Sequence, residues 1–438
     1  MATSYTRARK MRSMYSPAMV GWVRLTRHAS ITESPERIYF APLVSQPMRQ
    51  VWILTLAQGL AACGTIILVS FAGIIGTHIA PSPALATLPL SLSVLGVASM
   101  SLPAALLMQR IGRKPAFVAS ALIASLAALG CARAIHTSNF VLLCSMAFFI
   151  GGNMAFVQQY RFAAMELVST NEAGRAASTV MIGTLGAALL GPTVGEFAKN
   201  LGGWSEYTGS FVVLSALCVL AALVLSRIPL ARPAGRLEAR STKRFSDFLK
   251  VPGYRLAVFA GLSSYAVMSF IMTATPLSMH VHDGFSSSET TLVITAHLLG
   301  MYLPSLVTPW LVAKLGPRGM IATGLLANVL CIGIAAWVGH EFLHYFTALL
   351  ILGVGWNLMF VGATVMLAAH YAPADRFRAQ GYNDLSVFGS QAMASLLAGT
   401  AIETLGWQTL NLVALPLLAL VAWSLWRTPV DAAPRPNA

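Results

Sequence analysis

The chain has 438 residues, of which 56% are hydrophobic and only 10% are charged. Because soluble domains average about 25% charged residues, this composition excludes an ordinary water-soluble protein and indicates an integral membrane protein. The formal net charge of +14 would suit a nucleic-acid-binding protein. The basic residues lie between long apolar segments, however, and a membrane topology explains that placement better, so we expect no nucleic-acid partner.

The chain begins with a polar, basic stretch, and we expect residues 1–48 to form a disordered cytoplasmic tail. This stretch lacks the apolar core of a cleavable signal peptide. Twelve apolar segments follow, each long enough to cross a bilayer as a helix. They lie at residues 51–78, 86–108, 115–135, 139–165, 177–198, 209–230, 255–280, 291–313, 319–339, 344–369, 381–402 and 406–426.

The predicted fold is therefore all-α, with twelve transmembrane helices in two halves. A stretch rich in Arg, Lys and Pro separates the first six segments from the last six. We divide the chain into an N-terminal six-helix half (49–231), a cytoplasmic linker (232–252), a C-terminal six-helix half (253–428) and a cytoplasmic tail (429–438).

The two halves share an internal repeat with an offset of 204 residues. Arg110-Ile111-Gly112-Arg113-Lys114 follows the second segment, and Lys314-Leu315-Gly316-Pro317-Arg318 follows the eighth. Asn153-Met154-Ala155-Phe156-Val157 in the fourth segment matches Asn357-Leu358-Met359-Phe360-Val361 in the tenth. One offset at two separate places predicts two structurally related halves, as in many transporters.

The basic residues predict the orientation. With the N-terminus in the cytoplasm, all of the 29 Lys and Arg residues except Arg133 and Lys199 fall on the cytoplasmic side. This is the positive-inside pattern, and it predicts that both termini are cytoplasmic.

The loop after the second segment resembles the signature of the major facilitator superfamily. Arg110, Gly112, Arg113 and Lys114 match it, and Gly316 and Arg318 belong to the weaker copy in the second half. The resemblance implies a secondary transporter that works by alternating access, with these residues in a conformational loop. The chain departs from the signature at Ala105 and at Gln109, where the family has an acid that helps latch the cytoplasmic side; Gln109 cannot form an ion pair.

Four side chains in the second half are suited to a soft metal ion. Met268 and Met272 are four residues apart, as are His297 and Met301, so each pair shares one face of its helix. A turn midway between the pairs would place Met268 level with Met301 and Met272 level with His297. Thioether and imidazole groups bind Cu(I), and the four residues are candidate ligands for a copper ion in transit. Methionine is also a common packing residue, which is the structural alternative.

These paired motifs resemble those of the CcoA-like copper importers, a bacterial branch of the superfamily. The segment Gln159-Tyr160-Arg161-Phe162-Ala163-Ala164 is also similar to that branch. The resemblance implies copper import across the bacterial inner membrane, with copper as a transported substrate and no resident cofactor. A sister group imports riboflavin, and the resemblance leaves both substrates open.

Polar residues in the fourth segment are the competing candidates for substrate binding. Asn153, Gln158, Gln159, Tyr160 and Arg161 are candidate cavity-lining residues, because polar groups within a membrane tend to line a pathway. They would suit riboflavin or another small organic molecule.

Arg161 has two open interpretations: it pairs with Glu166 or Asp384, or it snorkels to the cytoplasmic surface. The acids Glu196, Asp384 and Glu403 could carry a coupling proton, but we expect them at helix ends.

The sequence contains no nucleotide-binding, metal-hydrolase or nucleophile motif, so we expect no enzyme activity. The expected partners are a small molecule or ion and the lipid bilayer, with a monomer as the working unit. A third hypothesis is a membrane sensor or assembly factor that binds a ligand without transporting it.

Overall fold

The computed structural model describes residues 46–82, 85–228 and 242–429, and these form helices and connecting turns without a β-strand. The predicted tail over 1–48 and C-terminal tail over 429–438 lie almost entirely outside the described residues. Within these described ranges, ten helical segments are long and apolar enough to cross a membrane. The predicted linker (232–252) is described only in its second part, which contains the short helix α10.

The helices of the first half are α3 (Gln46–Ile79), α4 (Leu88–Ile111), α5 (Arg113–His136), α6 (Phe140–Val157), α7 (Tyr160–Glu166), η3 (Thr170–Glu172), α8 (Ala173–Ala198), η4 (Leu201–Gly203) and α9 (Thr208–Ser226). Those of the second half are α10 (Phe245–Leu249), α11 (Pro252–Pro276), η5 (Leu277–His282), α12 (Ser287–Tyr302), η6 (Leu303–Leu306), α13 (Thr308–Trp337), α14 (Phe342–Ala368), η7 (Pro373–Asp375), α15 (Arg376–Val413) and α16 (Leu415–Arg427).

These helices account for the twelve predicted crossings, although several boundaries differ. The eighth predicted segment (291–313) comprises α12, η6 and the first turns of α13. The eleventh and twelfth lie in one long apolar stretch, Pro373–Arg427, which bends at Gly406 (φ 71°). The fourth predicted segment (139–165) matches one apolar span, Phe140–Glu166, in which a turn at Gln158 and Gln159 separates α6 from α7.

Two glycines show the predicted repeat in the backbone. Gly112, between α4 and α5, has φ 89° and ψ 161°, and Gly316, within α13, has φ 67° and ψ 170°. Residues with a side chain rarely adopt this conformation, so glycine allows a sharp corner at both positions. The corner at Gly316 ends the eighth crossing and starts the ninth.

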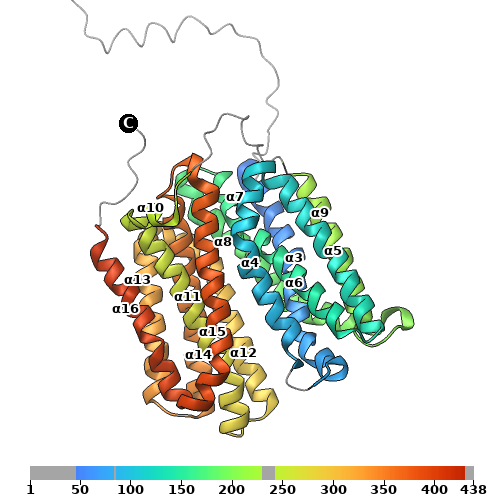
Figure 1. The fold of residues 1–438 in the computed structure, drawn as a ribbon. Helices are drawn as coiled ribbons and strands as arrows, with labels where there is room; N and C mark the ends of the chain where they lie inside the picture. Colours follow the sequence, from blue (N-terminus) through green and yellow to red (C-terminus); the bar gives the residue numbers. More distant parts are fainter. Residues whose placement is uncertain (1–45, 83–84, 229–241, 430–438) are drawn as a thin grey trace, which may run out of the picture. The chain divides into compact units, whose positions relative to one another are not determined.

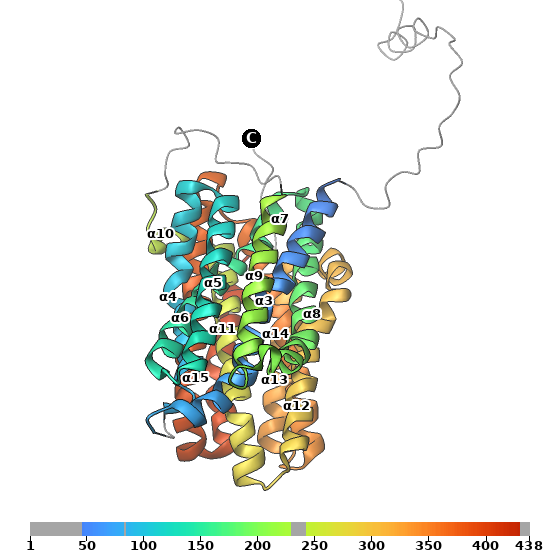
Figure 2. The ribbon, with the colours of Figure 1, turned by 90° about the vertical axis from the view of Figure 1, so that its right-hand side faces the viewer.

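The helices of the two halves gather on opposite sides of the bundle, with their axes roughly parallel (Figures 1 and 2). Between the halves, α4 packs against α15, and α8 packs against α12 and α13. We call the end that carries α7, α10 and η7 the predicted cytoplasmic end, because the positive-inside pattern assigns it to that side.

Close helix packing holds the first half together. A Cβ atom added at Gly151 of α6 would lie 1.9 Å from the Ser93 carbonyl oxygen of α4, and one added at Gly96 would lie 2.2 Å from the Phe148 carbonyl oxygen. Glycines at such contacts let membrane helices approach closely. The α4–α6 pair therefore depends on the absence of side chains at these positions.

We expect Gly151→Ala to lower the stability of the detergent-solubilised protein, because α4 and α6 must move apart. Overpacking of this kind costs about 1–3 kcal/mol. The matched control is Gly186→Ala on α8, where an added Cβ meets nothing within 4 Å. Thermal unfolding should show a lower midpoint for Gly151→Ala only, and equal midpoints would contradict the assigned packing.

Candidate functional site

The break in the fourth crossing positions the candidate site. The Gln159 N–H donates to the Phe156 carbonyl at 3.0 Å, a tighter turn than an α-helix, and α7 begins at the next residue. The break redirects the chain, so that Gln158 and Arg161 face a pocket between the two halves. Interrupted helices beside a substrate site are common in transporters.

The central pocket is small, about 30 Å³, and both halves line it. Its walls are Gln58, Met154, Val157, Gln158, Arg161, Val180, Met181 and Thr184 from the first half and Tyr265, Tyr302, Trp356 and Phe360 from the second. The polar side chains come mostly from the first half, whereas every aromatic ring comes from the second.

The aromatic wall is an ordered stack. The rings of Trp356 and Phe360, one helical turn apart on α14, are nearly parallel, with centroids 5.3 Å apart and an interplanar angle of 19°. Tyr265 from α11 meets both rings edge-on at 5.2 and 4.9 Å. Tyr302 from α12 meets Trp356 edge-on at 5.8 Å. These contacts fix the rings in place and make this wall of the pocket aromatic.

Several polar atoms of the pocket residues are buried without a hydrogen-bond partner among the described residues. They are Oε1 of Gln58, Nε of Arg161 and Nε1 of Trp356. Gln58 uses its amide nitrogen to donate to Thr184 Oγ1 at 2.9 Å, and its side-chain carbonyl oxygen accepts from no group in the described part of the chain. Unsatisfied buried groups are costly, and a bound molecule could satisfy one acceptor and two donors here.

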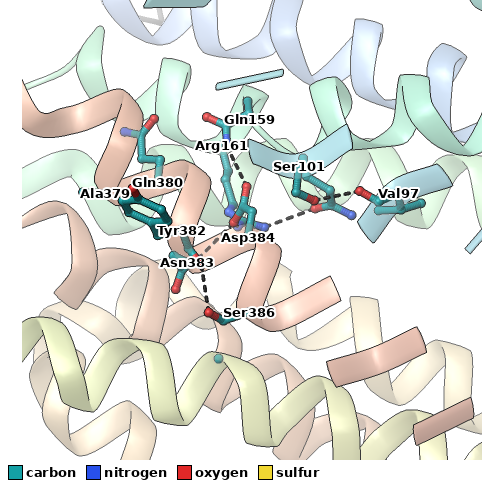
Figure 3. Close-up of polar contacts among 12 residues, drawn as sticks. Val97, Ser101, Gln159, Arg161, Ala379, Gln380, Tyr382, Asn383, Asp384 and Ser386 are labelled. Atoms are coloured by element: carbon teal, nitrogen blue, oxygen red, sulfur yellow. Dashed lines mark hydrogen bonds and ion pairs between the residues drawn. The ribbon is translucent and has the colours of Figure 1, made fainter. Parts of the chain in front are cut away.

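A buried ion pair adjoins the pocket. Arg161 Nη2 of α7 donates to Asp384 Oδ1 of α15 at 2.6 Å, and the two side chains are 4% and 1% exposed. Gln159 Nε2 donates to Asp384 Oδ2 at 2.6 Å, and Asn383 Nδ2 donates to Oδ1 at 2.9 Å. Figure 3 shows Arg161 and Gln159 converging on Asp384. The pair joins the two halves, because α7 and α15 belong to different ones.

A second polar cluster lies closer to the predicted cytoplasmic end. Arg113 holds Glu166 with two hydrogen bonds, at 2.9 and 2.7 Å, and donates to Gln380 Oε1 of α15 at 2.7 Å. Arg113 Nη1 also donates to Gln159 Oε1 at 3.4 Å, which connects the two clusters. Although Gln109 occupies the position of the family's acid, Arg113 has a carboxylate partner in Glu166.

A larger cavity of about 960 Å³ opens at this end, between α7, α8, α13, α14 and α15. Arg113 and Glu166 line it, whereas Arg161 lines the central pocket. The polar network from Arg161 through Asp384 and Gln159 to Arg113 therefore reaches from one cavity to the other.

The structure divides the predicted polar site residues. Gln158 and Arg161 line the pocket. Gln159 is buried in the ion-pair network, and Tyr160 is buried against Phe117, with ring centroids 4.6 Å apart. Asn153 is buried on α6 but lines neither cavity.

The four soft-ligand candidates are buried or partly buried near the central pocket. Met268, Met272 and Met301 pack in a hydrophobic cluster that also contains Tyr265 and Trp356. His297 is fully buried, and its Nδ1 bonds the Leu349 carbonyl of α14 at 2.8 Å. Its Nε2 has no partner among the described residues.

The residues predicted to form the two conformational loops differ in burial and in contacts. Arg113 is buried, whereas Arg110 is exposed and Lys114 is half-buried. Arg318 donates to the backbone carbonyls of Leu425 and Thr428, and so ties the corner at Gly316 to the end of α16.

Two interpretations from the sequence were wrong. Arg161 does not snorkel, because it is buried in the pair with Asp384. Asp384 is not at a helix end, because α15 begins at Arg376, two turns earlier. Sequence reasoning also missed the aromatic wall, although the four-residue spacing of Trp356 and Phe360 was a readable signal.

The whole transmembrane region matches one family model. The Major Facilitator Superfamily model matches residues 54–277 and 257–438. The chain belongs to the major facilitator superfamily. It is accordingly a multi-pass membrane transporter and not an enzyme, as the sequence predicted.

Individual relatives agree with this assignment. The chain is 37% identical to the riboflavin transporter RfnT of Brucella anthropi over 375 residues, covering 85% of this chain and 94% of the relative. It is 30% identical to YdeG of Bacillus subtilis, an uncharacterised MFS-type transporter, covering 86% and 92%. A crystal structure of the MFS transporter FucP in the outward conformation superposes with a TM-score of 0.70 at 15% identity, covering 88% of this chain and 100% of FucP, and shows the shared fold.

We expect strong coupling between Arg161 and Asp384 in a double-mutant cycle of protein stability. Arg161→Gln and Asp384→Asn should each destabilise the protein by about 3–5 kcal/mol, because each leaves one buried charge unpaired. The double variant should be clearly more stable than the sum of the single effects predicts.

The control cycle uses the exposed pair Lys250 and Asp247, which lies on the surface at 3.1 Å. Exposed pairs contribute little, so this cycle should show little coupling. Unfolding by heat or denaturant measures both cycles, and additive effects of Arg161 and Asp384 would refute the assigned pair.

Proposed function

We propose that this transporter carries riboflavin or a closely similar planar heteroaromatic molecule into the cytoplasm across a bacterial inner membrane. The observation that carries the proposal is the central pocket, in which a rigid aromatic wall faces unsatisfied hydrogen-bonding groups. The similarity to a riboflavin transporter at 37% identity supports the same substrate class.

The pocket chemistry suits such a ring system. A fused heteroaromatic ring is flat and apolar on its faces and carries hydrogen-bond donors and acceptors at its edge. The Trp356–Phe360 wall can stack on a face of the ring. Arg161 Nε and Trp356 Nε1 can donate to ring carbonyl oxygens, and Gln58 Oε1 can accept from a ring N–H.

Transport requires the halves to separate around the pocket. A volume of about 30 Å³ holds roughly one water molecule, so a substrate enters only when the walls move apart. The contacts of α15 with Arg113, Gln159 and Arg161 lie between the pocket and the predicted cytoplasmic end. Breaking them would open the path toward the large cavity, in an alternating-access cycle.

Copper import has weaker support. Three of the four predicted ligands pack beside the aromatic wall, where they contribute to its apolar backing. The fourth, His297, is held by a backbone carbonyl of α14. The three methionines thus have a packing role without a metal, whereas His297 Nε2 is buried without a partner among the described residues. We therefore keep copper uptake as the competing outcome of the test.

We expect the chain to restore growth of a riboflavin auxotroph at low external riboflavin. Trp356→Ala should reduce riboflavin uptake about tenfold or more, because one aromatic stacking contact contributes about 1–3 kcal/mol. The matched control is Trp337→Ala, which removes a tryptophan that is 72% exposed. Uptake of labelled riboflavin, normalised to the amount of transporter in the membrane, measures both variants.

Three results would contradict the proposal. One is wild-type cells that accumulate no riboflavin. Another is equal loss of uptake in Trp356→Ala and Trp337→Ala, which would show that the central pocket does not bind the substrate. The third is copper accumulation that Met268→Ala with His297→Ala abolishes while riboflavin uptake stays absent, which would favour the copper relay.

A further inference from the structure

The large cavity at the predicted cytoplasmic end has an excess of positive charge in its walls. Three arginines line it, namely Arg113, Arg318 and Arg376. Among the described residues of the lining, Glu166 is the one carboxylate. With His370 neutral, the walls therefore carry two positive charges more than negative ones. Because arginine stays protonated in proteins, this excess is present at any physiological pH.

The three arginines of this cavity differ in what they contact. Glu166 accepts two hydrogen bonds from Arg113 and so neutralises it. Arg318 donates to two backbone carbonyls near the end of α16, which carry no net charge. Arg376 has no ion-pair partner among the described residues, and its Nε bonds no described group. Arg318 and Arg376 therefore supply the charge that remains uncompensated.

Apolar and aromatic side chains surround these cations. The guanidinium carbons of Arg113 and Arg376 lie 5.1 and 4.9 Å from the ring centroid of Phe377, so one ring supports both side chains. Phe162 and Met366 belong to the apolar part of the lining. A volume of about 960 Å³ is that of a site for a small organic molecule. The cavity thus suits a molecule with an apolar ring system and an anionic group.

The stretches of this chain outside the described ranges do not offer the missing anion. Residues 1–45 and 229–241 contain more basic than acidic residues, and residues 430–438 contain one of each. None of these stretches has a net negative charge. A separate anionic molecule from the cytoplasm is therefore the better complement to the cavity.

We propose that this cavity is an inhibitory site for an aromatic phosphomonoester: the phosphate pairs with Arg376 in the field of Arg318, and the ring lies against the apolar walls. The inference rests on the proposed function, because a phosphate added to a hydroxyl of the imported molecule gives a ligand of this class. A phosphomonoester carries a charge of about −1.5 to −2 at pH 7, which matches the excess in the walls. Guanidinium groups suit such an anion, since they donate two parallel hydrogen bonds to phosphate oxygens.

The position of the cavity explains why a ligand there would inhibit transport. Its walls come from α7 and α8 of the first half and from α13, α14 and α15 of the second. Within the lining, a Cβ added at Gly174 of α8 would lie 2.4 Å from Val312 Cγ1 of α13, so the halves are in close contact here. A ligand that fits this arrangement stabilises it against the others. It also occupies the route from the central pocket to the cytoplasm, so uptake falls as the phosphorylated product accumulates.

Riboflavin counterflow in membrane vesicles that contain the full-length protein tests the proposal. The probe is riboflavin 5′-phosphate, added outside the vesicles. Inside-out vesicles present the cytoplasmic face to the probe, and there it should reduce counterflow about tenfold or more at saturation. Right-side-out vesicles present the other face and should show little inhibition. Inorganic phosphate alone should inhibit neither preparation, because it lacks the ring.

Arg376→Gln should raise the inhibitory concentration of riboflavin 5′-phosphate about tenfold or more, because one charged hydrogen-bonding contact is lost. Counterflow without the probe should stay unchanged, and Arg376→Lys should retain part of the inhibition. The matched control is Arg378→Gln on the same helix, which removes a half-buried arginine outside the lining and should behave as the wild type. Thr170→Glu adds a carboxylate at an exposed position of the lining and should also weaken inhibition, so it serves if Arg376→Gln does not fold.

The outcomes separate the inhibitory site from the proposed function. Wild-type counterflow that riboflavin 5′-phosphate does not reduce in inside-out vesicles would overturn the site alone. Equal effects of Arg376→Gln and Arg378→Gln would overturn it as well, as would equal inhibition by inorganic phosphate. Absence of riboflavin counterflow in the wild type would overturn the proposed function. Binding of riboflavin 5′-phosphate to the purified protein, followed by quenching of flavin fluorescence, would still test the site, and equal affinity in Arg376→Gln would overturn it.

Discussion

The buried pair of Arg161 and Asp384 is the interaction on which the arrangement of the site depends. Two opposite charges in a membrane protein are stable only when they stay in contact, so the pair fixes α7 against α15. The break at Gln158 and Gln159 lies beside Arg161, and Gln159 and Arg161 both donate to Asp384. Residues at one break thus contribute to a contact between the halves, to the pocket lining and to the polar network.

The division of labour between the halves follows from this constraint. The first half contributes the arginine and the amides, and the second contributes the carboxylate and the rings. Neither half alone lines the pocket, so a molecule bound there would contact both halves. Such a ligand could favour one arrangement of the two halves over another.

Much of the fold could be predicted from the sequence, because the bilayer imposes a length and an apolar composition on each crossing. The repeat of Gly112 and Gly316 was visible for a similar reason, since only glycine suits that backbone. The break at Gln158 was not predicted, because glutamine has no distinctive backbone preference. The partner of Arg161 also remained open between Glu166 and Asp384. Spacing along one chain cannot choose between acids 5 and 223 residues away, and the fold gives Glu166 to Arg113 instead.

The four candidate copper ligands show the same limit of prediction from spacing along the sequence. Spacing placed Met268, Met272, His297 and Met301 on helix faces, but it could not show that a carbonyl of α14 holds His297. The aromatic wall was predictable in part from Trp356 and Phe360, whereas the contribution of Tyr265, 91 residues before Trp356, required the tertiary structure.

The small size of the central pocket has a consequence for the resting membrane. With side chains filling the space between the halves, the central pocket has room for roughly one water molecule. So little space would limit the passage of hydrated ions at that depth while no substrate is bound. A carrier closed in this way could be kept in the membrane in many copies at a low cost to the electrochemical gradient.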